Sequence, residues 1–99
     1  MVHHIVMWNF LESMSQEEKQ NAAVKMKELL EPIGALVEGA VSIKVVSNEL
    51  ESSNRDVVLI SQFETVEALK AYQVHPAHVE AGKFVRSVTI NRSCLDFEE

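Results

Sequence analysis

The chain has 99 residues and a formal net charge of −6, and both values limit what it can do. A chain of this length is predicted to form one domain, here residues 1–99. The negative charge argues against binding to nucleic acid, which needs a basic surface, and against attraction to anionic lipid.

The apolar fraction, 46%, is high for so small a domain. A small domain has a thin core, so part of this surface is predicted to pack against a partner. Cys94 is the only cysteine, which excludes an intramolecular disulfide and suits a reducing compartment. The chain shows no signal-peptide pattern and no apolar stretch of the roughly 18 residues that a membrane span needs. We therefore expect a cytoplasmic protein.

The first predicted element is a strand from His3 to Phe10. Side chains alternate along a strand, so His4, Val6 and Trp8 share one face. Both faces are largely apolar, which predicts that the strand is covered on both sides.

A helix is predicted next, because Ser15 and Glu18 have the spacing of a capping box. The apolar residues from Ala22 to Ile33 then follow helical spacing. Pro32 and Gly34 mark the end of this pattern.

Two strands are predicted to follow, from Val41 to Leu50 and from Val57 to Phe63. The segment 51–56 between them is polar and rich in turn-forming residues. The apolar run at 57–60 indicates that the third strand is buried on both faces.

Thr65 is a suitable cap for a second helix that continues through Tyr72. Pro76 interrupts this helix, and a new helix is predicted to begin there and run toward Val85. The last predicted strand extends from Thr89 to Phe97.

The predicted order is β-α-β-β-α-β, which is an α+β, ferredoxin-like arrangement. Its four-stranded antiparallel sheet carries both helices on one face. Because the second face is also apolar, we expect two copies to pack sheet against sheet as a two-fold homodimer with a barrel-like core.

The segment from Tyr72 to Val79 contains the densest group of side chains able to move protons. His78 can accept and return a proton near neutral pH, and Tyr72 can donate a hydrogen bond to a carbonyl or enolate. His4 enters the same pocket if its face of the first strand meets the helices. Each histidine also has a structural alternative, in which His78 binds backbone or water and His4 is a buried, satisfied side chain.

Metal binding is not predicted. His75 and His78 are three residues apart and His4 could join them, but the motif contains no Cys or Asp to complete a site. Cys94 has no evident base and is expected to be a packed apolar residue.

The sequence resembles the stress-responsive α/β barrel (Dabb) family along essentially its whole length. The resemblance rests on the opening strand His4-Ile5-Val6, on the helix entry from Phe63 to Leu69, and above all on Tyr72-x-x-His75-Pro76-Ala77-His78. It implies a dimer with a pocket between sheet and helices in each subunit.

One plant member of this family is a polyketide cyclase that uses no metal or organic cofactor. The resemblance implies catalytic roles for His78, Tyr72 and His4. It also implies a pocket that includes positions on the first helix, where this chain has small or flexible residues in place of aromatics. The expected pocket residues are Val6, Trp8, Ala22, Ala23, Met26 and His75.

Two functions remain open at this point. The first is cofactor-independent acid–base chemistry, of the cyclase or isomerase type, on a small carbonyl or aromatic compound. The second is a ligand-binding or stress-response module without catalysis. Neither a nucleophile triad nor a phosphate loop is present to favour other reactions.

Overall fold

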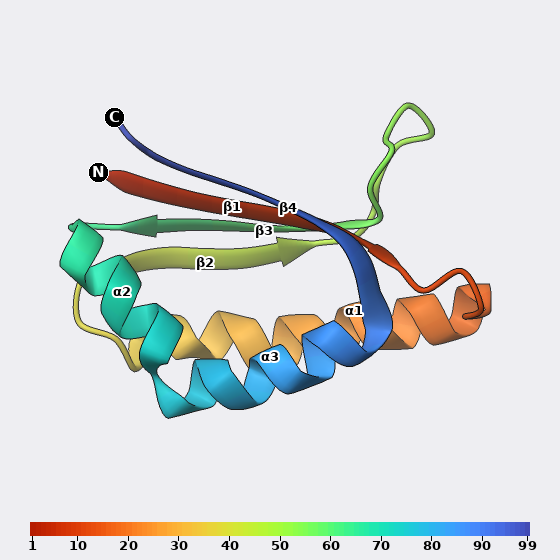
Figure 1. Ribbon diagram of the computed structural model, residues 1–99, viewed down its shortest axis with the longest axis horizontal. Helices are drawn as coiled ribbons and strands as arrows, with labels where there is room; N and C mark the ends of the chain where they lie inside the picture. Colours follow the sequence, from red (N-terminus) through yellow and green to blue (C-terminus); the bar gives the residue numbers. More distant parts are fainter.

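The computed structural model describes all residues, 1–99, as a four-stranded antiparallel sheet with helices on one side (Figure 1). The strands lie in the order β2-β3-β1-β4, so the ferredoxin-like arrangement predicted from the sequence is confirmed. The elements in chain order are β1 (Val2–Phe10), α1 (Gln16–Leu30), the short 3-10 helix η1 (Glu31–Ala35), β2 (Ala40–Val46), β3 (Val57–Phe63), α2 (Val66–Val74), α3 (Pro76–Val88) and β4 (Thr89–Glu98).

The predicted helix caps are present. The Glu18 N–H donates to the Ser15 hydroxyl, and the Ser15 N–H donates to the Glu18 carboxylate, at 3.1 and 2.8 Å. The Ala68 N–H donates to the Thr65 hydroxyl at 3.0 Å, which fixes the start of α2. Local sequence therefore determines where both helices begin.

Pro76 separates α2 from α3, as predicted. His75 has an extended backbone, with φ −61° and ψ 136°, and Pro76 is the first residue of α3. A proline tolerates this position because the first N–H groups of a helix have no intrahelical acceptor. The break redirects the chain so that α3 runs beneath the sheet beside α1 (Figure 1).

The core lies between the sheet and the helices. It receives one row of alternate residues from each inner strand, including Val6 and Trp8 from β1 and Leu59 and Phe63 from β3. These side chains are at most 7% exposed. His4, Val6 and Trp8 share one face of β1, as predicted, and this face is turned toward the helices.

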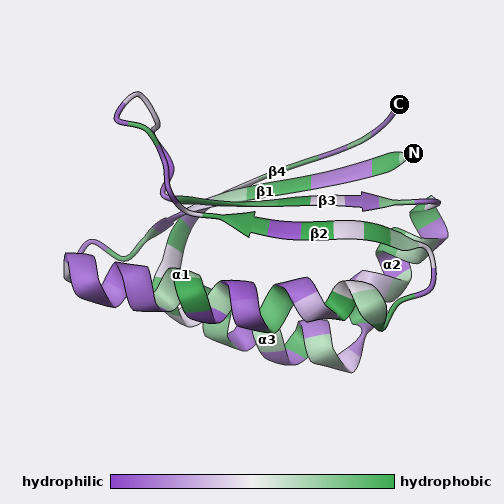
Figure 2. Cartoon of the chain, turned by 180° about the vertical axis from the view of Figure 1, so that it is seen from behind, coloured by the Kyte–Doolittle hydropathy of each residue, from purple (hydrophilic) through white to green (hydrophobic).

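The side of the sheet away from the helices, called the outer face below, is not covered within one chain (Figure 2). It carries large apolar side chains that include Met7, Ile60 and Leu95, which are 38%, 42% and 62% exposed. The expected burial of β1 and β3 on both faces therefore does not occur in a single copy. A second copy or another partner is needed to cover this face.

Two predicted boundaries are wrong. β2 ends at Val46 rather than at Leu50, because Val46 pairs with Val58 near the start of β3 and no strand lies beyond to pair with residues 47–50. Leu50 is accordingly 76% exposed in the loop 47–56. The first helix is regular only to Leu30, after which η1 replaces it. No helix in the structure has the length and hydropathy required to cross a bilayer.

Candidate functional site

A cavity of about 180 Å³ lies between the inner face of the sheet and helix α3. Strands β1, β3 and β4 and helices α1, α2 and α3 all contribute to its wall. The lining residues are His4, Val6, Trp8, Leu30, Leu59, Tyr72, His78, Gly82, Val85, Arg86 and Arg92. The three polar residues singled out from the sequence, His4, Tyr72 and His78, thus surround one space.

Tyr72 is fully buried at the wall of this cavity. Its ring packs against Phe63, with the ring centres 5.1 Å apart. Its hydroxyl is also buried and has no hydrogen-bond partner in the protein. Buried hydroxyl groups are usually satisfied, so this unpartnered hydroxyl is a candidate for binding water or a ligand. Burial raises the pKa of Tyr72 to about 12, which keeps it a hydrogen-bond donor at neutral pH.

His78, in the first turn of α3, packs beside Tyr72 with the ring centres 4.4 Å apart. Its Nδ1 lies 3.1 Å from the Gln73 carbonyl oxygen. Because a carbonyl only accepts, Nδ1 carries the proton, and Nε2 of the neutral ring is left as an acceptor. Burial lowers the pKa of His78, with smaller contributions from neighbouring positive charges. The ring is therefore neutral and able to take up a proton near pH 7.

His4, on β1, is the second imidazole of the cavity and is 3% exposed. Its Nδ1 donates a hydrogen bond to the Asp96 carboxylate on the neighbouring strand β4. The Ser61 hydroxyl donates to the His4 carbonyl oxygen at 2.7 Å. Asp96 thus fixes the tautomer of His4 and leaves Nε2 as the free acceptor.

Cys94 lies in the same row of β4, and the expectation that it is a packed residue is wrong. Its side chain is exposed, because β4 is an edge strand and no helix covers this position. Its sulfur lies 3.5 Å from Oδ1 of Asp96 and 3.9 Å from Nδ1 of His4. Desolvation and the Asp96 carboxylate raise the pKa of the Cys94 thiol. A protonated thiol is a poor nucleophile, which argues against a nucleophilic role for Cys94.

The residues best placed to hold a metal ion are His4, Cys94 and Asp96 rather than the three histidines considered from the sequence. Their donor atoms all lie within 4.8 Å of one another. In the present arrangement His4 and Asp96 are joined directly by a hydrogen bond, so an ion would have to replace that bond. The arrangement fits a carboxylate–imidazole pair better than a preformed metal site.

The other expected pocket residues divide into two groups. Val6 and Trp8 line the cavity. Ala22, Ala23 and Met26, on α1, are buried in the core but do not line it. The cavity instead reaches α1 only at Leu30, the last residue of that helix.

His75 lies outside the cavity. Its Nδ1 accepts a hydrogen bond of 3.0 Å from the Ala77 N–H, which caps α3. It borders a different surface hollow beside residues 36–39 and the start of α2. In this structure His75 therefore caps the N-terminus of α3, the helix that carries His78.

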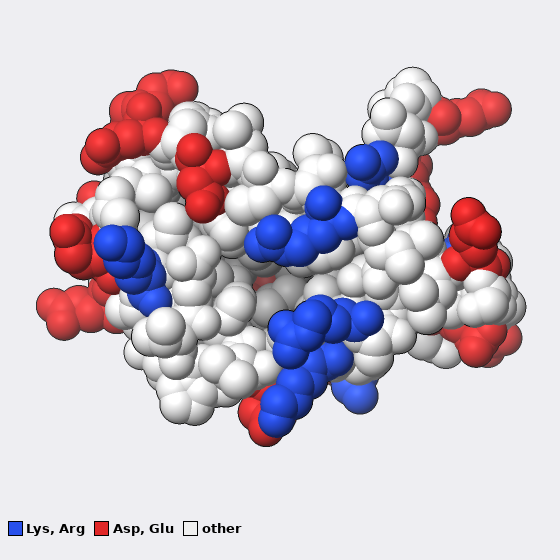
Figure 3. Space-filling view, viewed as in Figure 1, with Lys and Arg blue, Asp and Glu red and all other residues white.

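The sequence motif did not reveal Asp96, Arg86 and Arg92. Arg92 and Asp96 belong to one alternating row of β4 and face the helix side of the sheet, but this is visible only once the β1–β4 register is known. Arg86 lies on α3, two turns after His78. Figure 3 shows basic side chains on both sides of a hollow in this face of the molecule. Charge on the strand after a histidine-containing helix is a sequence signal that could have pointed to Arg92 and Asp96.

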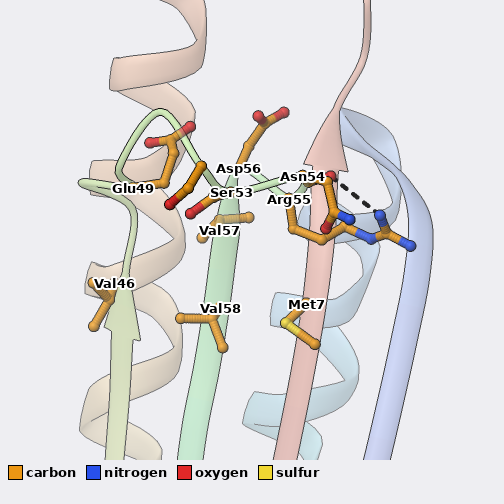
Figure 4. A pocket seen from close by; sticks show the side chains of 10 residues that line it. Met7, Val46, Glu49, Ser53, Asn54, Arg55, Asp56, Val57 and Val58 are labelled. Carbon is orange, nitrogen blue, oxygen red and sulfur yellow. Dashed lines mark hydrogen bonds between the residues drawn. The ribbon is translucent and has the colours of Figure 1, made fainter.

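A larger hollow, about 370 Å³, lies where the loop 47–56 overhangs the outer face (Figure 4). Its floor is apolar and includes Met7 and Val58. Arg55 donates to the Asn54 carbonyl at 3.1 Å, and its Nε is buried without a partner. This hollow contains no imidazole or phenol. We therefore place the candidate site in the smaller cavity, where three proton-transfer groups meet.

The fold and this site are those of a ferredoxin-like α+β protein with a cavity beneath its sheet. The model of the stress responsive A/B barrel domain, Dabb, matches residues 2–99, and the chain belongs to this family. Among curated proteins, none matches the sequence.

Solved structures agree with this assignment. A dimeric protein of unknown function from Bacteroides fragilis has 31% sequence identity and a TM-score of 0.90, over 99% of this chain and 95% of its own. A Dabb family protein from Mesorhizobium loti has 18% identity and a TM-score of 0.73, over 99% and 95% of the two chains. SnoaB, a cofactor-independent oxygenase from Streptomyces nogalater, has 11% identity and a TM-score of 0.70, over 99% and 91%, which shows a shared fold alone.

Proposed function

We propose that this protein carries out acid–base chemistry without an organic cofactor on a small carbonyl or aromatic compound bound beneath the sheet. The observation that supports this most directly is that Tyr72, whose buried hydroxyl has no partner in the protein, lines the same cavity as His4 and His78. A ligand carbonyl would supply the missing acceptor and would lie beside the free nitrogen of His78.

The reaction class follows from these positions. His78 Nε2 takes a proton from a carbon next to a carbonyl, and the electron pair of the broken C–H bond becomes an enolate. Tyr72 donates a hydrogen bond to the enolate oxygen, which lowers the energy of that charge. The enolate carbon can then attack a second carbonyl of the same molecule, giving an aldol ring closure, or be reprotonated elsewhere, giving an isomer. In both cases His78 returns its proton to the product.

His4 has a supporting role in this proposal. Asp96 holds its Nδ1–H, so the ring offers Nε2 to the cavity in a fixed orientation. It can accept a hydrogen bond from a ligand hydroxyl, or a second proton in the course of the reaction. Two bases on different walls, His4 on β1 and His78 on α3, suit a reaction in which protons leave one atom and arrive at another.

The proposal can be tested by exchange at the acidic carbon of a β-dicarbonyl compound. In deuterated buffer, acetylacetone should exchange its central hydrogens faster with the protein than with buffer alone, as measured by proton NMR. His78→Gln should reduce this acceleration at least about 100-fold, the usual size of general-base catalysis. His75→Asn is the control, since it removes an imidazole three residues away and outside the cavity, while asparagine, a favoured N-cap residue, can still cap α3.

Equal acceleration by wild type and His78→Gln would contradict the catalytic role. Binding of acetylacetone without any acceleration would instead favour a ligand-binding or stress-response module. The two functions left open by the sequence are thus separated by one comparison, because the first needs a working base and the second needs only the cavity.

We further propose that two copies associate through their outer faces. This face exposes large apolar side chains, including Met7, Ile60 and Leu95, and an apolar face of this kind is typical of an interaction surface. The relative from Bacteroides fragilis is described as dimeric. Light scattering at micromolar concentration should return twice the chain mass of 11.1 kDa. A value equal to the chain mass would contradict the dimer.

A further inference from the structure

We propose that the ligand of this cavity is an organic carboxylate, whose charged end binds between Arg86 and Arg92 while its other end meets Tyr72 and His78. The inference rests on the proposed function to the extent that the cavity beneath the sheet is the ligand site. It adds the chemical class of the ligand and two residues that select it.

The first observation is the charge at the cavity. The chain has a net charge of −6, and yet two cationic side chains line this space, while the nearby Asp96 carboxylate is bonded to His4 of its wall. Figure 3 shows positive side chains on either side of the hollow. A cavity with this charge in an acidic protein favours anions over neutral or cationic molecules.

The second observation is that neither arginine has an acidic partner. The ion pairs of the structure are His4–Asp96, Lys27–Glu31 and Lys83–Glu80, and none includes Arg86 or Arg92. The Asp96 carboxylate, the acidic group nearest in sequence to Arg92, is bonded to His4 instead. Two guanidinium groups without carboxylate partners can present paired N–H donors to a ligand carboxylate.

The third observation is Gly82, in the interior of α3. A Cβ built at Gly82 would lie 3.1 Å from a terminal nitrogen of Arg86, which is closer than normal contact. The Arg86 side chain thus folds back over the bare backbone of Gly82, and both residues line the cavity. Glycine is unfavourable inside a helix. The close approach of the Arg86 guanidinium gives a structural reason for glycine at position 82.

The positions of these residues indicate how the ligand is oriented in the cavity. The arginines lie on α3 and β4, whereas Tyr72 and His78 lie at the junction of α2 and α3, two turns of helix from Arg86. Val6, between His4 and Trp8 on β1, and its cross-strand partner Leu59 form an apolar part of the wall. A molecule with a carboxylate at one end and a carbonyl or hydroxyl at the other, separated by an apolar body, matches this order of groups.

Binding of an anion should also change the protonation of His78. The groups that face it are His4 on β1, Tyr72 on α2, Arg86 on α3 and Arg92 on β4, and the two arginines help to lower its pKa. A bound carboxylate neutralises part of this positive charge. The pKa of His78 should then be higher in the complex than in the free protein, because its charged form is less strongly opposed.

The test uses two compounds of nearly the same shape, 4-hydroxybenzoate and the neutral 4-hydroxybenzamide, titrated into the intact protein and followed by NMR chemical shifts. The acid should bind at least about tenfold more tightly than the amide, as expected for a charge-assisted pair. Arg86→Gln and Arg92→Gln should each remove about tenfold of the acid's affinity and leave the amide unchanged. Arg86→Lys should restore only part of it, since lysine keeps the charge but not the paired donors.

Lys83→Gln is the matched control. It removes one positive charge from the same helix at an exposed position that does not line the cavity. It should leave the affinity for 4-hydroxybenzoate unchanged. The imidazole shifts of His78, followed against pH, should show a raised pKa with the acid bound and no change with the amide.

The inference is overturned if the acid and the amide bind equally in the cavity, or if Lys83→Gln weakens the acid as much as the arginine substitutions do. Displacement of 4-hydroxybenzoate by an equal concentration of inorganic phosphate would also overturn it, because the site would then select small anions rather than an organic carboxylate. These results leave the acetylacetone exchange untouched. The class of ligand and the proposed proton transfer can therefore fail separately.

Discussion

At the scale of single residues, the Tyr72 hydroxyl is the most informative group in the protein. Its ring is well packed in the core, so the side chain is retained in place by apolar contacts alone. Its oxygen is buried without a partner in the protein, which is unfavourable for folding. A group that reduces stability in this way is typical of a site shaped for a ligand.

Replacement of Tyr72 by Phe should therefore increase stability and reduce activity together. Removal of an unsatisfied buried hydroxyl is expected to raise the free energy of unfolding by about 1 kcal/mol. For a domain of this size the melting temperature should rise by about 4–8 °C, which calorimetry can measure. Acceleration of acetylacetone exchange should fall in the same variant. A lower melting temperature would show that the Tyr72 hydroxyl already has a hydrogen-bond partner in the ligand-free protein.

His78 should make stability depend on pH in a defined direction. Its pKa is lower in the folded protein than the ordinary value of 6.5, so below that value the unfolded chain binds the proton more readily. The stability that the neutral ring contributes is present above pH 6.5 and is lost as the pH falls through the folded pKa.

Urea unfolding at about pH 7.5 and about pH 5 should measure this effect. The wild type should lose more stability between the two conditions than His78→Gln, which cannot take up the proton. An equal loss in both proteins would show that His78 is freely solvated. If His78 is the base, activity should have its acid limb below pH 6.5.

The sequence could predict which side chains transfer protons, but not which residues hold those side chains in position. His4 is visible from the alternation of β1, and Tyr72 and His78 from their motif. Asp96 becomes part of the site only because β1 and β4 pair with His4 opposite it. His4 and Asp96 are 92 positions apart in the sequence. No local sequence pattern contains the information that sets a register between such distant residues.

At the scale of elements, helix α3 combines a structural and a functional demand. Its start is fixed by Pro76 and the His75 cap, and its interior contains Gly82 beneath the Arg86 guanidinium. The helix would be more stable without a glycine there. The Arg86 guanidinium lies close to where a Cβ of residue 82 would be, which gives a structural reason for glycine at this position.

Gly82→Ala should separate the effect of this glycine on helix stability from its effect on ligand binding. Helix propensity alone should raise the free energy of unfolding by about 0.5–1 kcal/mol. The new methyl group should push the Arg86 guanidinium away from its present place and weaken binding of 4-hydroxybenzoate several-fold. Chemical denaturation and the same NMR titration measure the two effects. Unchanged affinity would show that Arg86 binds the acid from more than one position.

The elements themselves were largely predictable, because their limits depend on local chemistry. Ser15, Thr65 and Pro76 each begin a helix for reasons contained in a few neighbouring residues. The end of β2 was not predictable in this way. Residues 47–50 are compatible with a strand, and they leave the sheet only because β3 offers no partner beyond Val57.

At the scale of the whole molecule, the outer face decides whether the protein is a monomer or a dimer. Ile60 lies on β3, an inner strand, and its side chain is 42% exposed on this face. Its substitution by Glu would place a charge at the centre of the proposed interface without touching the cavity on the other side of the sheet. Buried unpaired charges are strongly unfavourable.

Ile60→Glu should therefore reduce the mass seen by light scattering from twice 11.1 kDa to 11.1 kDa. Val24→Glu is the control, because Val24 is an apolar residue of α1 with 56% exposure on the helix side. It adds the same charge and should leave the mass unchanged. Dissociation by both variants would indicate that net charge, rather than this face, controls association.

The two chain ends meet where the start of β1 pairs with the end of the edge strand β4 (Figure 1). The Met1 amino group donates to the Glu99 carbonyl at 3.1 Å, and the Glu99 N–H donates to the Met1 carbonyl at 3.0 Å. A short peptide could therefore join them, and new ends could be opened in the exposed loop between β2 and β3. Such a circular permutant would keep every strand beside its present neighbours. It would turn the present outermost strand pair into a continuous hairpin and place both new termini far from the cavity.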